Sequence, residues 1–450
     1  MVMSGYVPKD VMSVFRGVTC IMRDPGDQPL TFDVGATIYI VMSILRQSQP
    51  MKKLLIIGTM PIILDMNADS SSDSEEEEIG ETEETTQKPI TCLISHDECY
   101  VAPQLLNELY VEIFARVPCS EYWKLQFLNK RFSQLLKSSE IFRMRQKLGL
   151  VKPYLFLLSS GANRWTMFDK DFESFLKLPK LSSNICFFNG DKEVTSVGTQ
   201  LIVIGKEVEG ITVWRFELEM QKWVKGPAMI TPRVMFGSAS HGTNAFFAGG
   251  VKIDKNSYEV VSIAEKYNAE TKTWTAIHAM HKRRKLCSGF FLRGKFYVLG
   301  GQNENDEYLT CAESYNEVTD SWELIPNMLK DMPVLFSQAP PRIAVVNDNL
   351  YLLETSLNEL HVYDVNANAW KKLGVVPVGA HFTRGWGVAF KSVGDELLVI
   401  GASSARPQSQ SMTVYKCRPD VEEIVWEECK RCCRGVRLNH FILNCCVMLA

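Results

Sequence analysis

The sequence predicts a multidomain protein, in which a small all-α three-helix bundle precedes an all-β six-bladed propeller. Apolar residues recur at helical spacing over 104–150, and short apolar runs bounded by Gly, Asn, Asp or Pro follow from residue 151 onward. In that second part a pattern repeats about every 50 residues, which is the interval of one propeller blade. Periodicity therefore separates the two domains before any motif is considered.

Composition describes an ordinary globular chain. Its 450 residues, 46% hydrophobic and 22% charged, suffice for two or three domains with real cores. A formal net charge of -3 argues against nucleic acid as a partner. Thirteen cysteines without framework spacing, and no secretory signal, favour free thiols in the nucleus or cytoplasm. No segment reaches the roughly 18 apolar residues of a membrane span, so no membrane partner is expected.

The first 95 residues lie outside both predicted domains. Residues 1–66 contain two short apolar runs, which fit buried strands, and we assign this segment no domain. Residues 67–95 begin with "NADSSSDSEEEEIGETEETTQK", which has too few bulky apolar groups to offset the entropy of folding. We predict a disordered acidic linker there. Its serines also fit acid-directed phosphorylation, although a solvated spacer is the simpler interpretation.

Residues 96–149 carry the helical pattern. One helix face holds Leu106, Leu109, Ile113, Phe114 and Val117, and a second holds Leu125, Leu128, Phe132, Leu135 and Leu136. Pro118 ends the first helix, and we expect Ser120 and Ser139 to cap the second and third. Gly149 is expected to end the third helix. The result is a small bundle with apolar surface to spare.

Glycine pairs end two apolar runs of the second domain. "AFFAGG" ends at Gly250 and "FYVLGG" ends at Gly301, 51 residues later, with weaker copies at 201–205, 350–355 and 397–402. Glycine suits a tight turn beside neighbouring chain, where a side chain would clash. We therefore interpret Gly249, Gly250, Gly300 and Gly301 as the ends of second blade strands and not as a phosphate-binding loop.

A spaced aromatic pair accompanies the glycines. In five places an aromatic residue precedes another by seven, as in "YNAETKTW", and the second members include Trp223, Trp274, Trp322 and Trp370. Turn-forming residues lie between the two aromatics, so each segment predicts a hairpin whose Trp packs between adjacent blades. The interval near 50, the diglycine and the Tyr…Trp pair together are the kelch signature.

The predicted propeller covers residues 150–450, which is enough for about six blades. Repeats are expected near 151–179, 199–227, 244–278, 295–326, 348–374 and 395–426. No innermost strand precedes "PYLFLLSS" in the first blade. We expect the apolar run at 441–449 to supply that strand, closing the ring and removing both sheet edges.

Over residues 95–450 the chain resembles the plant F-box/kelch-repeat family. The F-box frame is matched by Leu105, Glu108, Ile113, Arg116, Val117, Pro118, Leu125, Asn129, Lys130, Arg131 and Phe132. Leu106 stands where many F-boxes have Pro, and Phe132 stands where Trp is common. The kelch part matches through "KLCSGFFLRGKFYVLGG", "GWGVAF" and "NCCVM", among others.

The resemblance implies a substrate-recognition subunit of an SCF-type ubiquitin ligase, without catalytic residues, cofactor or metal of its own. The F-box would bind the Skp-type adaptor, and through it the cullin–RING ligase, while the propeller would hold a protein substrate. The implied adaptor-binding residues are Leu105, Leu106, Leu109, Ile113, Val117, Pro118, Leu125, Leu128 and Phe132.

The substrate should bind where loop lengths vary. The loops after the glycine pairs and after the Trp strands open on one face of a propeller, and the first of these differ in length between repeats, while the Tyr–Trp hairpins do not. We expect a mixed-charge substrate-binding face formed by Arg233, Lys252, Asp254, Lys282, Arg283, Arg284, Asn303, Glu304 and Asp306.

Other interpretations stay open at this point. A kelch propeller can be a protein-binding scaffold that acts without a ligase, its helical bundle being only a docking piece. "HKRRK" at 281–285 fits a nuclear-import patch. Cys429, Cys432, His440 and Cys445 have zinc-like spacing, although small buried hydrophobes are the simpler interpretation. Some kelch propellers are copper oxidases, but the seven histidines here are scattered.

Overall fold

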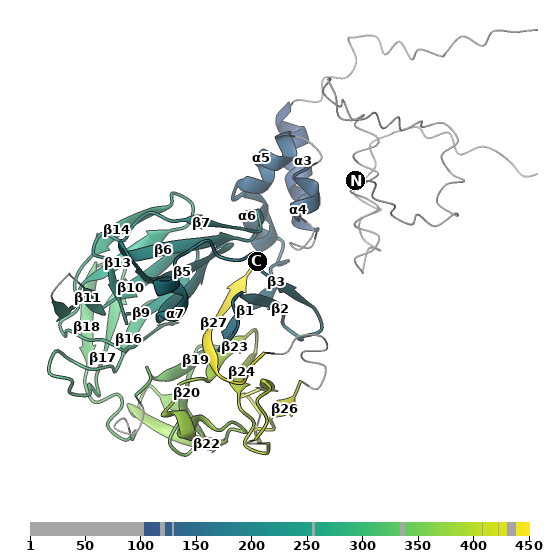
Figure 1. Cartoon of the computed structure of the whole chain (residues 1–450). Helices are drawn as coiled ribbons and strands as arrows, with labels where there is room; N and C mark the ends of the chain where they lie inside the picture. Colours follow the sequence, from purple (N-terminus) through teal and green to yellow (C-terminus); the bar gives the residue numbers. More distant parts are fainter. Residues whose placement is uncertain are drawn as a thin grey trace, which may run out of the picture. The chain divides into compact units, whose positions relative to one another are not determined.

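Figure 1 shows the computed structural model of the chain, with helices preceding a series of β-sheets. The structure describes residues 103–117, 122–127, 130–253, 257–333, 338–406, 408–421, 423–429 and 438–450. The predictions for 1–66, for the linker 67–95, and for Pro118, Ser120 and Asp254 lie outside these residues. No helix in the described part of the chain is long and apolar enough to cross a membrane.

Four helices form the first described part: α3 (Pro103–Ala115), α4 (Tyr122–Leu125), α5 (Lys130–Lys137) and α6 (Glu140–Lys147). Phe114, Leu125 and Phe132 are buried among them, and the Phe114 and Phe132 rings meet edge to face at 4.9 Å. The apolar stripes therefore point inward, as their spacing predicted. The second predicted helix is two shorter ones, because residues 126–127 turn the chain between α4 and α5.

The ends of α6 test two predictions about capping. Ser139 has helical backbone angles and its side chain makes no capping hydrogen bond, so its predicted role is wrong. The hydroxyl of Ser138 instead accepts from the Glu140 N–H at 3.4 Å. Gly149 ends the helix as predicted, since its φ of +63° is a conformation that glycine adopts at little cost. Position alone could not decide which of two adjacent serines turns its hydroxyl toward the helix.

In the rest of the described chain the regular secondary structure is almost entirely antiparallel sheet, in blades of the kelch type. The first two sheets, each in hydrogen-bonded order, are β27 (Ile442–Leu449), β1 (Pro153–Ser159), β2 (Thr166–Asp169), β3 (Phe175–Lys177); and β4 (Lys192–Val197), β5 (Gln200–Glu207), β6 (Gly210–Glu217), β7 (Lys222–Lys225). A short helix, α7 (Ile185–Asn189), connects them along the chain.

Four further four-stranded sheets follow the same antiparallel order. They are β9 (Gly237–His241), β10 (Asn244–Ala248), β13 (Ala264–Asn268), β14 (Thr273–Ile277); β15 (Ser288–Leu292), β16 (Lys295–Leu299), β17 (Ala312–Asn316), β18 (Ser321–Ile325); β19 (Arg342–Val346), β20 (Asn349–Glu354), β21 (Glu359–Asp364), β22 (Ala369–Val375); and β23 (Ala389–Val393), β24 (Glu396–Gly401), β25 (Thr413–Cys417), β26 (Glu427–Glu428). A 3-10 turn, Ala380–Thr383, precedes the last of them.

One sheet was missed by the sequence analysis. The residues after the second glycine of the first pair form β11 (Val251–Ile253) and β12 (Tyr258–Val260), which pair with β8 (Arg233–Val234) in a three-stranded sheet. The strands have two or three residues each, which is too short for an alternating pattern to be visible. Lys252, predicted on a loop, therefore lies in a strand.

Each spaced aromatic pair is a cross-strand pair. Tyr267 lies opposite Trp274, and Tyr315 lies opposite Trp322, as the hairpin interpretation requires. The indole N–H then reaches the loop that leaves the preceding sheet: Trp223 donates to Pro179 O at 3.0 Å, Trp274 to Pro227 O at 3.0 Å, Trp322 to His278 O at 2.6 Å and Trp370 to Met328 O at 2.7 Å. The tryptophans thus join consecutive sheets.

The glycine pairs occupy turns that exclude any side chain. Gly250 and Gly301 have φ values of +101° and +87°. A Cβ at these positions would lie 2.5 Å from Val234 O and 2.4 Å from Lys285 O. Both the backbone angle and the neighbouring carbonyl therefore require glycine.

Six strands, one from the edge of each four-stranded sheet, contact one another in sequence. We call β4, β9, β15, β19, β23 and β27 the inner strands; each contacts the next, and β27 contacts both β23 and β4. β27, yellow in Figure 1, pairs antiparallel with β1 from Pro153–Leu449 to Ser159–Ile442. The last strand of the chain is thereby part of the first sheet.

Candidate functional site

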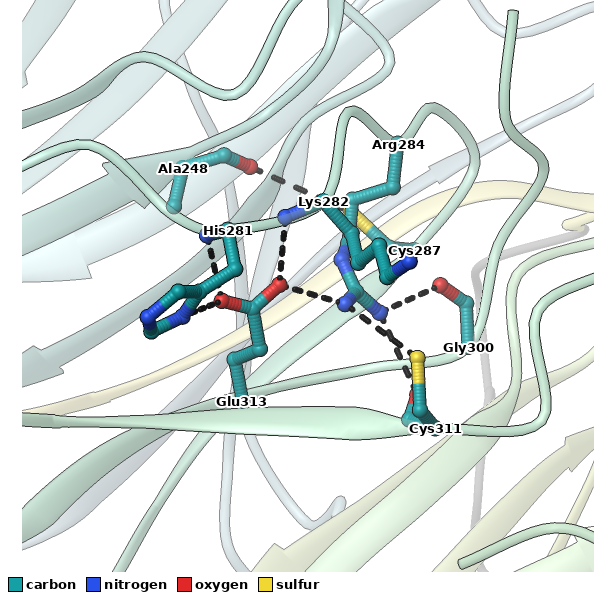
Figure 2. Close-up of polar contacts among 8 residues, drawn as sticks. All are labelled: Ala248, His281, Lys282, Arg284, Cys287, Gly300, Cys311 and Glu313. Atoms are coloured by element: carbon teal, nitrogen blue, oxygen red, sulfur yellow. Dashed lines mark hydrogen bonds and ion pairs between the residues drawn. The ribbon is translucent and has the colours of Figure 1, made fainter. Parts of the chain in front are cut away.

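A buried ion pair holds the loop before β15 (Figure 2). Arg284 Nη2 lies 2.7 Å from Glu313 Oε1, and neither side chain is exposed. Arg284 Nη1 also donates to the carbonyl of Gly300 at 3.0 Å. The Glu313 carboxylate accepts the backbone N–H groups of His281 and Lys282, at 2.6 and 3.0 Å. The pair therefore joins the loop, the third strand and the glycine pair of one sheet.

The preceding sheet contains the same arrangement. Arg233 Nη1 lies 2.6 Å from Glu265 Oε1, with both side chains fully buried, and Arg233 Nε donates to Gly249 O at 2.8 Å. The Glu265 carboxylate accepts the N–H groups of Ile230 and Thr231 at 3.1 and 2.8 Å. Two consecutive sheets thus contain the same buried Arg–Glu pair with the same two backbone N–H contacts.

The prediction that Arg233 and Arg284 line the substrate-binding face is therefore wrong. A fully buried guanidinium that is paired with a carboxylate stabilises its loop and cannot contact a partner. The loop sequences show the positive charges but not the acidic residues on β13 and β17 that neutralise them.

The other predicted substrate-face residues have different surroundings. Lys282, Arg283, Glu304 and Asp306 are exposed, and Lys252 and Asn303 are half-buried. Asn303 shapes its own loop, because its Oδ1 accepts the N–H groups of Asn305 and Glu307, each at 2.9 Å. Asp306 forms an ion pair with Lys285. The exposed residues of this end of the sheets thus carry both signs of charge.

The six inner strands line an open cavity of about 180 Å³, which we call the inner-strand cavity. Every inner strand contributes to its lining, which includes Glu193, Ser288, Arg342, Ala389, Lys391 and Asn444. Sequence reasoning missed Glu193, Arg342 and Lys391, since nothing near them in sequence resembles a motif.

Glu193 and Arg342 occupy matching places on their strands. Glu193 pairs with Ile204 on β5 and Arg342 pairs with Leu353 on β20. Ile204 and Leu353 each stand directly before the strand position that Gly249 and Gly300 occupy in their own sheets. Glu193 and Arg342 therefore lie at the same height along the inner strands, which we call one level. The same level holds, in the order of strand contacts, Asn444, Glu193, Gly237, Ser288, Arg342 and Ala389. Two strands separate Glu193 from Arg342 in either direction, so they lie on opposite sides of the cavity.

The surroundings of both groups disfavour their charged forms. Burial raises the pKa of Glu193 to about 7, against the opposing effects of the Met235 N–H, which donates to Glu193 Oε1 at 3.0 Å, and of the Arg342 charge. Burial likewise lowers the pKa of Arg342 to about 10, so it remains a cation at neutral pH. Arg342 Nε and Nη2 donate to Gly385 O at 3.0 and 2.9 Å.

The thiols beside the cavity are unreactive in this setting. Burial raises the pKa of Cys287 to about 11 and that of Cys445 to about 12, so both are neutral thiols near pH 7. Within the described ranges, no three His, Cys, Asp or Glu side chains are arranged to hold a metal ion. Cys432, a member of the alternative zinc set, lies outside those ranges.

The predicted adaptor-binding residues divide into three groups. Val117, Leu125 and Phe132 are buried in the helical core, so the prediction that they contact an adaptor is wrong for this arrangement. Ile113 is half-buried on α3. The side chains of Leu105, Leu106 and Leu109, and the whole of Pro118 and Leu128, lie outside what the structure describes. Sequence spacing identifies the apolar side chains, but it does not show which of them are buried in the core of the bundle and which stay available to a partner.

Arg145, which sequence reasoning missed, joins the helices to the last strand. The residue is 4% exposed, and its guanidinium donates to the carbonyls of Ala115, Val117 and Leu150, each at 2.9 Å, and of Ala450 at 3.3 Å. The position is one of several basic residues in the last turns of α6, so the sequence suggests only a solvated charge.

Comparison with known proteins gives one matching family model and several relatives. The family model described as "Kelch motif" matches residues 283–329, which include the sheet β15–β18. The F-box/kelch-repeat protein At3g27150 of Arabidopsis thaliana is 59% identical over 395 residues, covering 86% of this chain and 93% of the relative. F-box/kelch-repeat protein At1g26930 of the same plant is 33% identical over 365 residues, covering 79% of this chain and 84% of the relative.

A third relative and one solved structure extend the comparison. F-box/kelch-repeat protein At1g74510 of Arabidopsis thaliana is 35% identical over 350 residues, covering 74% of this chain and 76% of the relative. The structure of YjhT has a TM-score of 0.39 and 16% identity, over 53% of this chain and 82% of that chain, a likeness too weak to support an argument. The relatives alone carry the conclusion, which is that this chain belongs to the F-box/kelch-repeat protein family.

Proposed function

We propose that this chain is the substrate-recognition subunit of an SCF-type ubiquitin ligase. The F-box binds a Skp-type adaptor, and the kelch sheets hold the protein that is to be ubiquitinated. Membership of the F-box/kelch-repeat family, at 59% identity over 93% of one relative, is the observation that carries the proposal. In this ligase the chain has a non-catalytic role. The other subunits carry out ubiquitin transfer, and this subunit brings a substrate lysine close to them.

The proposal includes a closed six-bladed propeller. Six four-stranded sheets and the contacts of β27 with both β23 and β4 support it, because a ring of blades needs each inner strand to have two neighbours. Pairing of β27 with β1 supports closure by the last strand, because it gives the first sheet the same four strands that the other five have.

Contacts of α6 support a division of labour between the two ends of the sheets. Arg143 Nη2 lies 2.7 Å from Glu270 Oε1, and Glu270 is in the turn between β13 and β14. Gly198, in the turn between β4 and β5, lies near the Phe142 ring. Since β4 runs from Lys192 beside the inner-strand cavity to Val197 beside Gly198, α6 contacts the end of the sheets opposite to that cavity. The cavity end is then the one available to a substrate.

We place this role in the nucleus, the cytoplasm or both. Cysteines without framework spacing support a reducing compartment. The "HKRRK" run does not strengthen a specifically nuclear assignment, because Arg284 within it is fully buried in the folded protein.

A kelch scaffold that works without a ligase is the second candidate, and one purification separates the two. Full-length protein and a version that lacks residues 96–149 are recovered from the native tissue, and the bound proteins are identified by mass spectrometry. We expect the Skp-type adaptor and a cullin with the full-length protein only, and shared proteins are then candidate substrates. Neither adaptor nor cullin with either version would favour the scaffold.

A further inference from the structure

We propose that the inner-strand cavity anchors a short segment of the target protein that carries one acidic and one basic side chain. The acidic side chain binds Arg342 and the basic one binds Glu193. The inference rests on the proposed function, since it assigns the recognition element of the same substrate, and it deepens it by naming the charge pattern of that element.

The two charged groups face one cavity without neutralising each other. They lie at one level on opposite sides of the cavity, and no ion pair joins them among the described residues. Within that part of the chain, Arg342 Nη1 has no hydrogen-bond acceptor, while Nε and Nη2 are held by Gly385 O. Glu193 Oε2 likewise has no donor there, while Oε1 is held by the Met235 N–H. Each group is thus hydrogen-bonded on one side, and the Arg342 guanidinium also lies 5.9 Å from the centre of the Trp386 ring.

The remaining positions of that level are small or already hydrogen-bonded, while Lys391, two residues beyond Ala389 on β23, adds a second cation to the cavity lining. Gly237 has no side chain, and Ala389 has only a methyl group. The Ser288 hydroxyl donates to Pro341 O at 2.6 Å, and Asn444 Nδ2 donates to Lys192 O at 2.7 Å. Small or satisfied residues therefore separate Glu193 from Arg342 in both directions.

Electrostatics favours an occupant with both charges. A charged group that is removed from water without a partner loses solvation free energy, and a complementary charge restores it. An occupant with only an acidic group would satisfy Arg342 but place its own negative charge near Glu193. One acidic and one basic group satisfy both sides at once.

The size of the cavity favours side chains of a protein segment over a free small molecule. Its volume of about 180 Å³ lies below the roughly 300–1,000 Å³ that usually enclose small-molecule ligands. Further binding energy must then come from the rim, where exposed Lys282, Arg283 and Glu304 can contact the residues that flank an inserted segment. A protein segment reaches both the cavity and the rim.

The test uses purified full-length protein and an array of synthetic 12-residue peptides. One set contains a single Glu and a single Arg, separated by one to four Ala or Ser residues, and matched sets contain only Glu, only Arg, two Arg or two Glu. We expect wild-type protein to bind the Glu/Arg set about tenfold more tightly than the single-charge sets.

Variants that reverse the charge of Arg342 or of Glu193 should change which peptide set is bound, and should not simply lose binding. Arg342→Glu should select the two-Arg peptides, and Glu193→Lys should select the two-Glu peptides. The exposed Lys371 on β22 provides a control, since Lys371→Glu makes a like change of charge away from the cavity and should keep the wild-type preference. A new preference cannot result from a misfolded variant, and thermal melting of each variant gives an independent check on folding.

Three results would overturn the inference: one peptide preference shared by wild type and both reversal variants, no preference among the sets, or binding of free glutamate or arginine without binding of any peptide. Adaptor binding by the same preparations keeps the proposed function separate. Adaptor binding without charge-dependent peptide selection would contradict only the inference, whereas charge-dependent selection without adaptor binding would contradict only the ligase role.

Discussion

Arg284 and Glu313 lie in contact at 2.7 Å with neither side chain exposed, and the sheet before them repeats the contact between Arg233 and Glu265. Positive charges that the sequence suggests for a partner are thus used inside the fold. A neighbouring loop pair, Lys285 with Asp306, has its carboxylate 72% exposed and provides a natural comparison.

Breaking the buried pair should cost far more stability than breaking the exposed one. Glu313→Ala leaves the Arg284 charge buried and two loop N–H groups without an acceptor, so we expect the free energy of unfolding to fall by about 3–5 kcal/mol. Asp306→Ala should lower it by less than about 1 kcal/mol, because an exposed pair gains little over solvation. Urea unfolding of both variants measures the difference. Equal losses would show that the buried pair has no structural role.

Glycine at the strand end should be required for two separate reasons, which two variants distinguish. Gly301→Ala places a Cβ 2.4 Å from Lys285 O and also strains the backbone, while Gly294, at a φ of +76°, has open space around the same position. Gly294→Ala should therefore cost about 1–2 kcal/mol, the backbone term alone. Gly301→Ala should cost clearly more, as measured by thermal or urea unfolding. Equal costs would contradict the close approach.

Glu193 should make stability depend on pH. Because burial raises its pKa to about 7 in the folded protein, from an ordinary value near 4.5, the folded state binds its proton more tightly than the unfolded state. Its contribution is therefore most favourable below pH 4.5 and is lost as the pH rises through 7. Glu193→Gln should remove that loss. The free energy of unfolding of the variant should therefore rise, relative to that of wild type, by on the order of 2 kcal/mol between pH 5 and 8.

Unfolding in urea at several pH values measures this gain. Glu219, whose pKa is also raised to about 7 by burial, is present in both proteins and cancels in the difference. A constant difference between variant and wild type from pH 5 to 8 would contradict a raised pKa at Glu193.

Arg145 should couple the helices to the final strand. Arg145→Ala leaves four carbonyl groups without this donor, and we expect a loss of about 2–4 kcal/mol together with faster proteolysis near α6. Arg143, whose side chain is 56% exposed in its pair with Glu270, provides the control on the same helix. Arg143→Ala should lose less than about 1 kcal/mol and keep the wild-type proteolysis pattern. Equal effects would remove the assigned role of Arg145.

The features that sequence predicted are those that recur at one interval. Trp274 and Trp322 lie opposite Tyr267 and Tyr315 because a hairpin of fixed length brings residues seven apart together, and glycines are visible wherever a strand end excludes Cβ. A further signal was available but unused. Glu265 and Glu313 both stand two residues before that Tyr, and Arg233 and Arg284 both stand 17 before the second glycine, a repetition that points to a structural pair.

Other features left no local signal. Glu193 and Arg342 share a level because β4 and β19 occupy places three apart among the inner strands, a relation that only the assembled sheets create. The F-box pattern located the apolar residues, but packing decides that Val117 and Phe132 are consumed by the bundle while Ile113 stays partly exposed. Arg145 is marked only by its burial and by its contact with Ala450, which lies 305 residues further along the chain.

Direct binding of a purified Skp-type adaptor tests the ligase role most directly. The adaptor is titrated calorimetrically into the full-length protein and into the Ile113→Asp variant, which adds a charge on the half-buried part of α3. We expect a one-to-one complex with wild type, at least about tenfold weaker binding by the variant and equal melting of the sheets in both. No binding of the adaptor by the folded wild-type protein would contradict the ligase role.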